Sequence, residues 1–229
     1  TSIWSSMVSQ WKFDEGAGSI AHDSVGNNDG TIFGATTATG KVGQALSFDG
    51  VNDYVSIGNR PDLNFGTSDF SVSVLIKGTA YSEILSKILA DSNNVGYELG
   101  ISTAGRTWSN FKGESGGAAG TYWQTEFTGA TNVKDNQWHH IVCARDKQLG
   151  SLFIYVDGSL SAGKKDTTIG SLDTIGSLWI GRRADNLYYY SGLIDELSFY
   201  NKALTSGEVL NLYQGKTIQP LLGDRRGTW

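Results

Sequence analysis

The sequence predicts an all-β fold of antiparallel strands, with one short helix near the C-terminus. Short apolar runs in which every second residue shares a face recur along the chain, as expected of strands with one side against a core. Turns rich in glycine and asparagine separate these runs, and the 229 residues include 30 glycines but only 2 prolines. No repeat of fixed period is present, which disfavours a propeller or a solenoid. A single domain is the preferred interpretation at this length.

The strand pattern is clearest in residues 70–77, FSVSVLIK, where Val72, Val74 and Ile76 share one face. Residues 151–158, SLFIYVDG, alternate in the same way and end in an Asp-Gly pair that is typical of a hairpin turn. Shorter runs extend the set of predicted strands at residues 45–50, 54–57, 97–101, 177–181 and 193–200.

One helix is predicted near the end of the chain, in the run LTSGEVLNLYQG. Thr205 and Glu208 have the spacing of a capping box, and Gly215 supplies a stop. The residues that follow lack periodicity and contain Pro220, so they indicate a tail or linker that docks on the body or on a neighbour.

Two histidines and the only cysteine lie within five positions, in the run DNQWHHIVCARD. Successive side chains of a strand point to opposite faces, so His139 and His140 cannot bind one metal together. His139 and Cys143 share a face but lie about 13 Å apart, too far for a nucleophile and its base. We interpret the run as an interior strand in which at least one imidazole is hydrogen-bonded to a neighbouring strand or loop.

Composition excludes several classes of function. The formal net charge of -5 leaves no basic stripe for a phosphate backbone, so no nucleic-acid partner is expected. No window approaches the ~18 apolar residues of a membrane span. Cys143 alone cannot form an intrachain disulfide, so cysteine usage does not indicate a compartment.

The order of the sequence motifs gives more specific information than any one motif. From the N-terminus the chain carries VSQWKFDEGAGSIAHDSVGNNDGTIFGA, GKVGQALSFDGVNDYVSIG, FSVSVLIKG, DNQWHHIVCARD, LFIYVDG, LWIGRR and YYYSGLIDELSFYNKALTSGEVLNLY. This order resembles the laminin-G-like, concanavalin A-like lectin/glucanase jelly-roll domains of bacterial and archaeal extracellular proteins. The resemblance covers about residues 7–214, and ALSFDGVNDYV combined with GLIDELSFYNKALTSGEV is its most specific part.

The resemblance implies an antiparallel two-sheet jelly-roll sandwich in which one sheet is curved, the first and last strands pair, and a helix closes the end. On this basis we assign residues 1–216 to a laminin-G-like jelly-roll domain and residues 217–229 to a C-terminal tail or linker. It also implies an extracellular or cell-surface protein, with a signal peptide that was removed or lies outside this sequence.

Three acidic turns, FDEG, SFDGVNDY and IDEL, offer hard oxygen ligands beside glycines or close to them. Domains similar to this one often hold a structural calcium between the first and last strands. The resemblance therefore implies a Ca²⁺ site, for which we predict Asp14, Asp49 and Asp195 as ligands. The alternative is that these aspartates only form turns and cap nearby amides.

No catalytic motif is present. Glycoside hydrolases on this type of sandwich place paired carboxylates on one face of one strand, about 5 Å apart, and the chain has no Glu-x-Asp-x-Glu run. Related polysaccharide lyases use an Arg, Gln-x-His and Tyr constellation, and His22, His139 and His140 do not lie in that setting. The sequence therefore favours a protein without catalytic residues.

Two predicted loops, GTYWQTEF and RRADNLYYYSG, carry aromatic rings beside polar side chains, among them arginine, aspartate and asparagine in the second loop. Sugars bind such sites, because the apolar face of a pyranose lies on a ring while arginine, aspartate and asparagine engage its hydroxyls. Loops of this composition equally suit a protein interface. The predicted ligand-binding residues are Tyr122, Trp123, Arg182, Arg183, Asp185 and Tyr188.

Arg182 and Arg183 alternate across a strand end, so one of them is expected to pair with an acidic neighbour at the surface. The other would point to the binding face, where a guanidinium suits an anionic glycan.

The leading hypothesis is a non-catalytic carbohydrate-binding or adhesion module that recognises a polysaccharide or a glycoprotein glycan through its loops or the concave sheet. The first alternative is a structural subunit or spacer of a surface assembly that contacts protein partners. The second is a polysaccharide lyase or glycoside hydrolase. Fold similarity alone does not separate them.

Overall fold

The computed structural model describes residues 3–89, 95–113, 123–168 and 170–215, which form two antiparallel β-sheets packed face to face. Sheet A contains β1 (Met7–Trp11), β4 (Thr36–Thr39), β5 (Gln44–Asp49), β7 (Phe70–Gly78), β12 (His139–Asp146), β13 (Ser151–Val156), β14 (Ser159–Lys165) and β16 (Ser191–Tyr200). Sheet B contains β2 (Ile20–Ala21), β3 (Gly30–Phe33), β6 (Tyr54–Gly58), β8 (Ser82–Ile88), β9 (Gly96–Ile101), β10 (Arg106–Gly113), β11 (Trp123–Asn132) and β15 (Leu178–Ile180). The helical segments are η1 (Trp4–Ser6), η2 (Pro61–Leu63) and α1 (Ser206–Tyr213).

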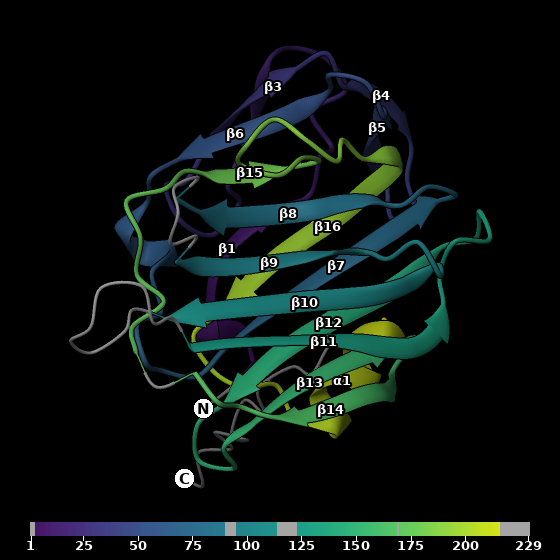
Figure 1. Cartoon of the computed structure of the whole chain (residues 1–229). Helices are drawn as coiled ribbons and strands as arrows, with labels where there is room; N and C mark the ends of the chain where they lie inside the picture. Colours follow the sequence, from purple (N-terminus) through teal and green to yellow (C-terminus); the bar gives the residue numbers. More distant parts are fainter. Residues whose placement is uncertain (1–2, 90–94, 114–122, 169, 216–229) are drawn as a thin grey trace, which may run out of the picture.

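The strand order is that of a jelly roll, in which hairpins of consecutive strands are joined to strands from distant parts of the sequence, such as β7 beside β16 and β8 beside β15. Sheet A runs β14-β13-β12-β7-β16-β5-β4, and sheet B runs β11-β10-β9-β8-β15-β6-β3-β2. Figure 1 shows sheet B in front, with the strands of sheet A crossing behind it. The first strand, β1, pairs with the last, β16, and this confirms the pairing that the family resemblance implied.

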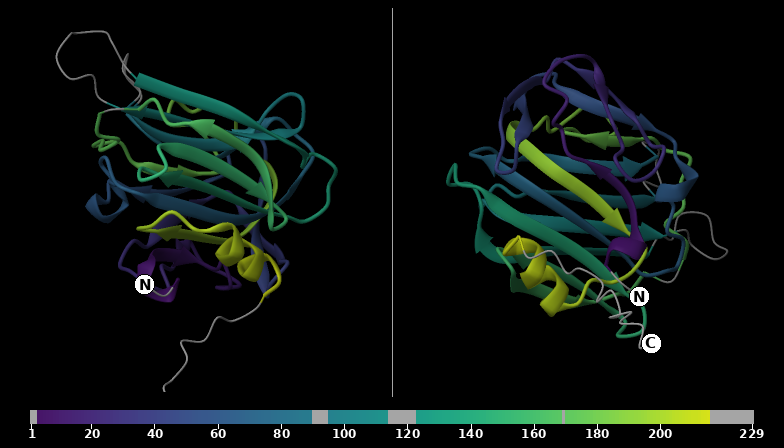
Figure 2. Two further views of the ribbon diagram at one scale, coloured as in Figure 1. Left: turned by 90° about the horizontal axis from the view of Figure 1, so that it is seen from below. Right: turned by 180° about the vertical axis from the view of Figure 1, so that it is seen from behind.

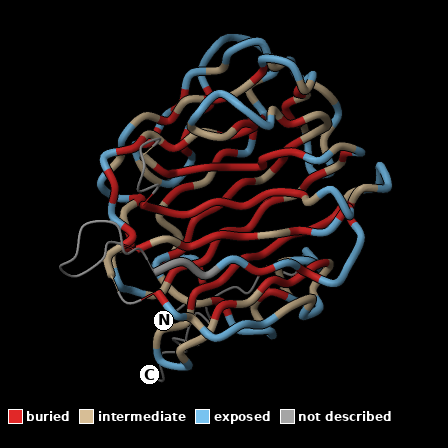
Figure 3. The backbone as a smooth tube through the Cα atoms, in the orientation of Figure 1, coloured by how far each residue is buried: buried red, intermediate tan, exposed pale blue. Residues whose placement is uncertain are grey.

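The core lies between the two sheets and is built from the faces that alternation predicted. Val72, Val74 and Ile76 of β7 are all buried in it, and Phe65 stacks on Phe70 with ring centroids 4.5 Å apart. Each fully buried aliphatic or aromatic side chain of this kind contributes about 1.5–3 kcal/mol. Figure 3 shows the buried residues running along the central strands of both sheets.

Helix α1 covers part of the outer surface of sheet A (Figure 2). Its predicted capping box is present, since Thr205 Oγ1 accepts from the Glu208 amide while the Glu208 side chain accepts from the Thr205 amide. Val209 is fully buried in a second, smaller apolar cluster with Val142 and Tyr155. Among the described residues, no helix is long and apolar enough to cross a membrane.

The His-His-Cys run forms β12 and has the structural role that the sequence indicated. His139 lies between two carboxylates, with Nε2 3.0 Å from Asp135 and Nδ1 2.8 Å from Asp157. His140 points to the other face, and its Nε2 lies 2.8 Å from the Ser73 hydroxyl. Burial raises the pKa of Cys143 to about 12, so this thiol is not a nucleophile.

Candidate functional site

Strands β8 and β9 of sheet B are buried on both faces (Figure 3), which is unusual for an antiparallel sheet at the surface of a sandwich. Their inner face carries apolar core residues such as Leu85 and Leu99. Their outer face carries polar residues instead, including Ser86 at 0% exposure and Glu98 at 6%. Buried polar groups lower stability unless they are hydrogen-bonded, so this outer face is a candidate site.

Strand register places a row of four polar residues across β8, β9, β10 and β11. Ser86 pairs with Glu98, Glu98 with Asn110, and Asn110 with Glu126. The Ser86 hydroxyl and the Asn110 Nδ2 donate to the Glu98 carboxylate, over 3.3 and 3.2 Å. We call these four residues the polar row.

A second row lies beside the polar row and contains Glu83, Gly100, Trp108 and Thr128. A Cβ atom on Gly100 would lie only 2.7 Å from Trp108 Nε1, so the indole extends from β10 across β9 at a position where only glycine leaves room. The Nε1 edge of the Trp108 ring therefore lies against the backbone of β9 at Gly100, near the Ser82 carbonyl of β8.

Three buried polar atoms of these two rows have no hydrogen-bond partner among the described residues: Glu83 Oε1, Trp108 Nε1 and Asn110 Oδ1. Such atoms are rare in native proteins, because each one retains the full cost of leaving water. Three of them lie on the same face of sheet B, so this face is a candidate for contact with a ligand.

The two buried carboxyl groups of this face have raised pKa values. Burial, and then the neighbouring Glu98, raise the pKa of Glu83 well above its usual range. Burial also raises the pKa of Glu98, although hydrogen bonds from Asn110 and Ser86 and the charge of Arg183 partly offset it. Desolvated groups of this kind cluster at functional sites.

Five residues of the two rows, Glu98, Trp108, Asn110, Glu126 and Thr128, line a hollow of about 440 Å³, a volume typical of small-ligand sites. We call it the polar hollow. It is lined by Tyr81, Glu98, Ser102, Thr103, Trp108, Asn110, Lys112, Glu126, Thr128 and Arg183.

The structure brings three of the predicted ligand-binding residues to the rim of the polar hollow. Arg183 lines it, and its Nε donates to both carboxylate oxygens of Asp185, over 3.0 and 3.1 Å. The Arg183 guanidinium also lies 4.5 Å from the centre of the Tyr188 ring, which contacts Tyr81. The prediction that one arginine pairs with an acidic neighbour is confirmed.

Arg182 does not reach the hollow. Its guanidinium lies over Trp179 and Tyr54, 3.8 and 4.3 Å from the ring centres, and the residue is 5% exposed. The prediction that the second arginine points to the binding face for an anion has no support here, because two rings already cover this side chain.

Tyr122 lies outside the described residues. Trp123 begins β11, opposite Gly113, but its side chain also lies outside what the structure describes. Their proposed role in binding stays a prediction.

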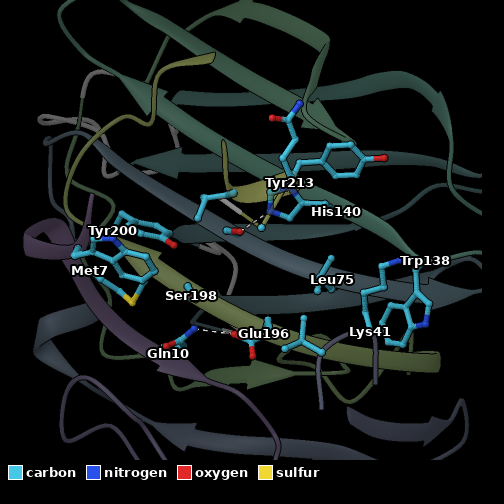
Figure 4. A pocket seen from close by; sticks show the side chains of 16 residues that line it. Met7, Gln10, Lys41, Leu75, Trp138, His140, Glu196, Ser198, Tyr200 and Tyr213 are labelled. Carbon is cyan, nitrogen blue, oxygen red and sulfur yellow. Dashed lines mark hydrogen bonds between the residues drawn. The ribbon is translucent and has the colours of Figure 1, made fainter. Parts of the chain in front are cut away.

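A second hollow, of about 480 Å³, lies on the outer surface of sheet A beside α1 (Figure 4). We call it the apolar hollow. Its walls are mainly apolar and aromatic. Gln10 donates to Glu196 over 2.7 Å and His140 Nε2 contacts Ser73, while the buried His140 Nδ1 has no partner among the described residues. It is lined by Trp4, Met7, Gln10, Lys41, Val42, Ser73, Leu75, Trp138, His140, Glu196, Ser198, Tyr200, Leu212, Tyr213, Gln214 and Gly215.

Comparison with known families matches residues 49–210 to the model of the concanavalin A-like lectin/glucanases superfamily. The chain belongs to this superfamily. The match covers the strands that build the polar hollow and extends into α1.

Relatives of this lectin-like domain include two clostridial proteins. The chain is 25% identical over 219 residues to a non-toxic nonhemagglutinin type A of Clostridium botulinum, covering 92% of this chain and 17% of that protein. It is 23% identical over 178 residues to the non-toxic nonhemagglutinin of Paraclostridium bifermentans, covering 76% and 14%. The domain thus spans about a sixth of the length of these relatives.

Solved structures with the same fold include two binding domains and one domain of an arabinanase. The binding domain of Paraclostridial Mosquitocidal Protein 1 matches with a TM-score of 0.74 and 16% identity, covering 93% of this chain and 53% of that one. Domain 4 of AbnA, a GH43 extracellular arabinanase from Geobacillus stearothermophilus, in complex with arabinotriose, matches with 0.64 and 22%, covering 91% and 98%. The botulinum neurotoxin serotype D ligand-binding domain with N-acetylneuraminic acid matches with 0.69 and 15%, covering 93% and 52%.

The three predicted calcium ligands of the lectin-like domain are not gathered at one point. Asp14 and Asp195 both accept from the same turn, from the amides of residues 44 and 41–42. Asp49 lies opposite Ser191, four residues along β16 from Asp195 and therefore about 13 Å away. Among the described residues, no group of three or more His, Cys, Asp or Glu side chains could hold a metal ion. Calcium binding itself stays a prediction.

Sequence reasoning missed the residues of the polar row. Glu98 alternates with the core residues Tyr97 and Leu99, so its position on the outer face was readable from the pattern. Its neighbours were not readable, because Ser86, Asn110 and Glu126 reach it only through the register of four strands.

Proposed function

We propose that this chain is a non-catalytic binding module that recognises carbohydrate at the polar hollow of sheet B. The observation that carries the proposal is a pair of buried polar atoms, Trp108 Nε1 and Asn110 Oδ1, which have no hydrogen-bond partner among the described residues and belong to side chains that line this hollow. A ligand with many hydroxyls, each able to donate and accept, is the chemistry that satisfies such a mixture.

The arrangement suits a sugar ring. The indole of Trp108 supplies a flat apolar surface for the C–H face of a pyranose. Glu98 and Asn110 supply oriented acceptors on the adjacent positions, fixed by their mutual hydrogen bond. Tyr81 and Arg183 at the rim bound the hollow on one side. Polar groups held by strands are better positioned than groups on loops, which favours a specific ligand orientation.

The comparisons support this proposal at the level of fold. Two structural neighbours were solved with sugars, arabinotriose in domain 4 of AbnA and N-acetylneuraminic acid in the neurotoxin domain. The superfamily carries lectins in its name. We extend the proposal to an adhesion or targeting role in an exported protein, in line with the extracellular arabinanase whose domain shares the fold.

The decisive experiment is a glycan array screened with the wild-type chain and two variants of the hollow, Trp108→Ala and Glu98→Ala. We expect hits whose affinity falls at least tenfold in both variants, which corresponds to about 1.4 kcal/mol of binding free energy. Trp138→Ala, in the apolar hollow, is the matched control and should keep full binding. An array without any hit, or with hits that all survive both variants, would rule out this site.

Protein contact is the second candidate function, and the apolar hollow favours it. Aromatic and aliphatic side chains such as Trp138, Leu75 and Tyr213 surround this hollow on the other sheet. Anchor residues of protein interfaces occupy pockets of this composition. Trp138→Ala would then weaken assembly with a protein partner while leaving glycan binding unchanged. The array control measures the unchanged glycan binding, and the assembly is measured separately.

Catalysis is the weaker alternative. Glu98 and Glu126 face the same hollow from strands two spacings apart, so two carboxylates are present. However, Asn110 lies between them in the row, and no histidine lines the hollow. We expect no release of reducing ends or unsaturated products from any glycan that binds, and such release would establish an enzyme instead.

A further inference from the structure

The polar hollow offers several hydrogen-bond acceptors to a ligand. When ionised, the carboxylates of Glu98 and Glu126, which both line the hollow, accept hydrogen bonds and donate none. Asn110 turns its Nδ2 toward Glu98, which leaves its Oδ1 as a further acceptor without a protein partner. A ligand in this hollow can therefore donate hydrogen bonds to these three side chains.

The two arginines near the hollow are already compensated or covered. Arg183 is bound through its Nε to the carboxylate of Asp185 and packs on Tyr188. Arg182 is buried over two rings and lies outside the lining.

Lys112 is the other cation of the lining, and it projects from β10 between the two strands that carry the lining carboxylates, Glu98 on β9 and Glu126 on β11. With Arg183 matched by Asp185, two carboxylates stand against this one ammonium. The balance of charge in the hollow is therefore negative.

We propose that the polar hollow selects neutral glycans and discriminates against glycans whose terminal sugar carries a carboxylate. This inference rests on the function proposed above and specifies its substrate class. A third carboxylate placed among Glu98 and Glu126 is repelled more strongly than in water, because the hollow is partly enclosed and its effective dielectric constant is lower. Hydroxyl groups of a neutral sugar donate to the same oxygens without that repulsion, so selectivity comes from an unfavourable interaction built against the wrong ligand.

The inference separates this chain from one of its structural neighbours. The neurotoxin domain was solved with N-acetylneuraminic acid, a sugar that carries a carboxylate, whereas the AbnA domain was solved with arabinotriose, a neutral one. The lining of the polar hollow predicts a neutral sugar as the ligand of this chain.

The test compares a neutral oligosaccharide that the array identifies with the same oligosaccharide capped by N-acetylneuraminic acid, both titrated calorimetrically at low ionic strength. We expect the capped form to bind at least tenfold more weakly to the wild type. Asp185→Asn removes the carboxylate that compensates Arg183. We expect this variant to bind the capped form more tightly, so that the ratio of the two affinities falls at least threefold. A gain of this kind cannot come from loss of folding.

The outcomes distinguish the inference from the proposed function. If capped glycans bind as tightly as neutral ones, or if only capped glycans bind, the charge argument is wrong while carbohydrate recognition stands. If no glycan of either kind binds, the proposed function is wrong and the inference falls with it. If the wild type prefers neutral glycans and Asp185→Asn keeps the same preference, the charge argument is also wrong. Arg183 would then have no part in discriminating against glycans that carry a carboxylate.

Discussion

Two groups of buried polar residues in this protein differ in how completely they are paired. At one end of sheet A, Arg145 and Asp166 form an ion pair of 3.0 Å with both side chains at 0% exposure. The remaining Arg145 nitrogens donate to the carbonyls of Gly66 and Thr168, and Lys147 adds a second cation to Asp166. Each charged side chain of this group has a hydrogen-bond partner.

The outer face of sheet B shows the opposite state. Glu83 and Asn110 keep buried oxygens without partners, and the pKa values of Glu83 and Glu98 are raised, mainly by burial. The pKa of Asp166 is instead lowered, because hydrogen bonds from Arg145, the Thr168 amide and Lys147 outweigh the effect of burial. Burial alone therefore does not identify a functional group; the lack of a described partner is what distinguishes this face from the Arg145–Asp166 pair.

The largest predicted effect tests the paired group. Arg145→Met leaves Asp166 buried without its main partner, and we expect the free energy of unfolding to fall by about 3–5 kcal/mol. Denaturant titration measures this. Lys147→Met removes the more exposed cation and should cost under about 1 kcal/mol. If Arg145→Met lowers the free energy of unfolding by less than the control Lys147→Met does, the Arg145–Asp166 pair contributes nothing to the stability of the fold.

The next effect has the opposite sign. Glu83→Met replaces a buried, partnerless carboxyl group with an apolar side chain of similar length, so we expect stability to rise by about 1–3 kcal/mol at neutral pH. The same titration measures it, with glycan affinity followed in parallel. Destabilisation by Glu83→Met would show that this carboxyl group is as well satisfied as that of Asp166, and the distinction between the two regions would fail.

Calcium extends the comparison to a third position. Asp195 Oδ1 is buried without a described partner, and burial, with the charge of Asp14 as a further cause, raises the pKa of Asp195 to about 6. We propose that a cation which binds between Asp14 and Asp195 stabilises the folded protein. At a free cation concentration ten times its dissociation constant, the gain is about 1.4 kcal/mol. Melting temperature with calcium and with a chelator measures this. Asp195→Asn should remove the response and Asp49→Asn should keep it; identical curves for the wild type would rule out the ion.

The smallest effect concerns pH. Burial, and then Asp195, raise the pKa of Glu196 to about 7, above its value in an unfolded chain. A carboxyl group with a raised folded pKa contributes stability that is complete below the unfolded pKa and is lost as pH rises through about 7. Glu196→Gln should therefore lose less stability than the wild type between pH 5 and pH 8, while exposed Glu126→Gln should follow the wild type. Equal pH slopes in all three proteins would contradict this.

The fold was largely predictable from the sequence because its determinants are local. Alternation assigned Val72, Val74 and Ile76 to the core, and the Thr205–Glu208 spacing set the start of α1. Asp157-Gly158 was readable as a hairpin turn, and both residues have positive φ, 51° and 77°. Strand β8 was not predicted, because a bulge between Glu83 and Leu85 interrupts its alternation.

The candidate site was only partly predictable. Arg183, Asp185 and Tyr188 were named from the composition of one loop, and they do lie at the rim of the polar hollow. Arg182, from the same loop, is instead held between rings that belong to β6 and β15. Loop composition gives the types of side chain that are present, but the direction of each side chain depends on neighbours that are distant in sequence.

By itself, the sequence determined which segments are extended, which face of each strand is apolar, and where the helix begins, since these follow from residues within a few positions of one another. The tertiary structure alone decided that Glu98, Asn110 and Glu126 form one row and that Trp108 lies over Gly100. Those contacts depend on the register of separate strands. A shift of one residue in that register would turn each of these side chains to the opposite face of the sheet.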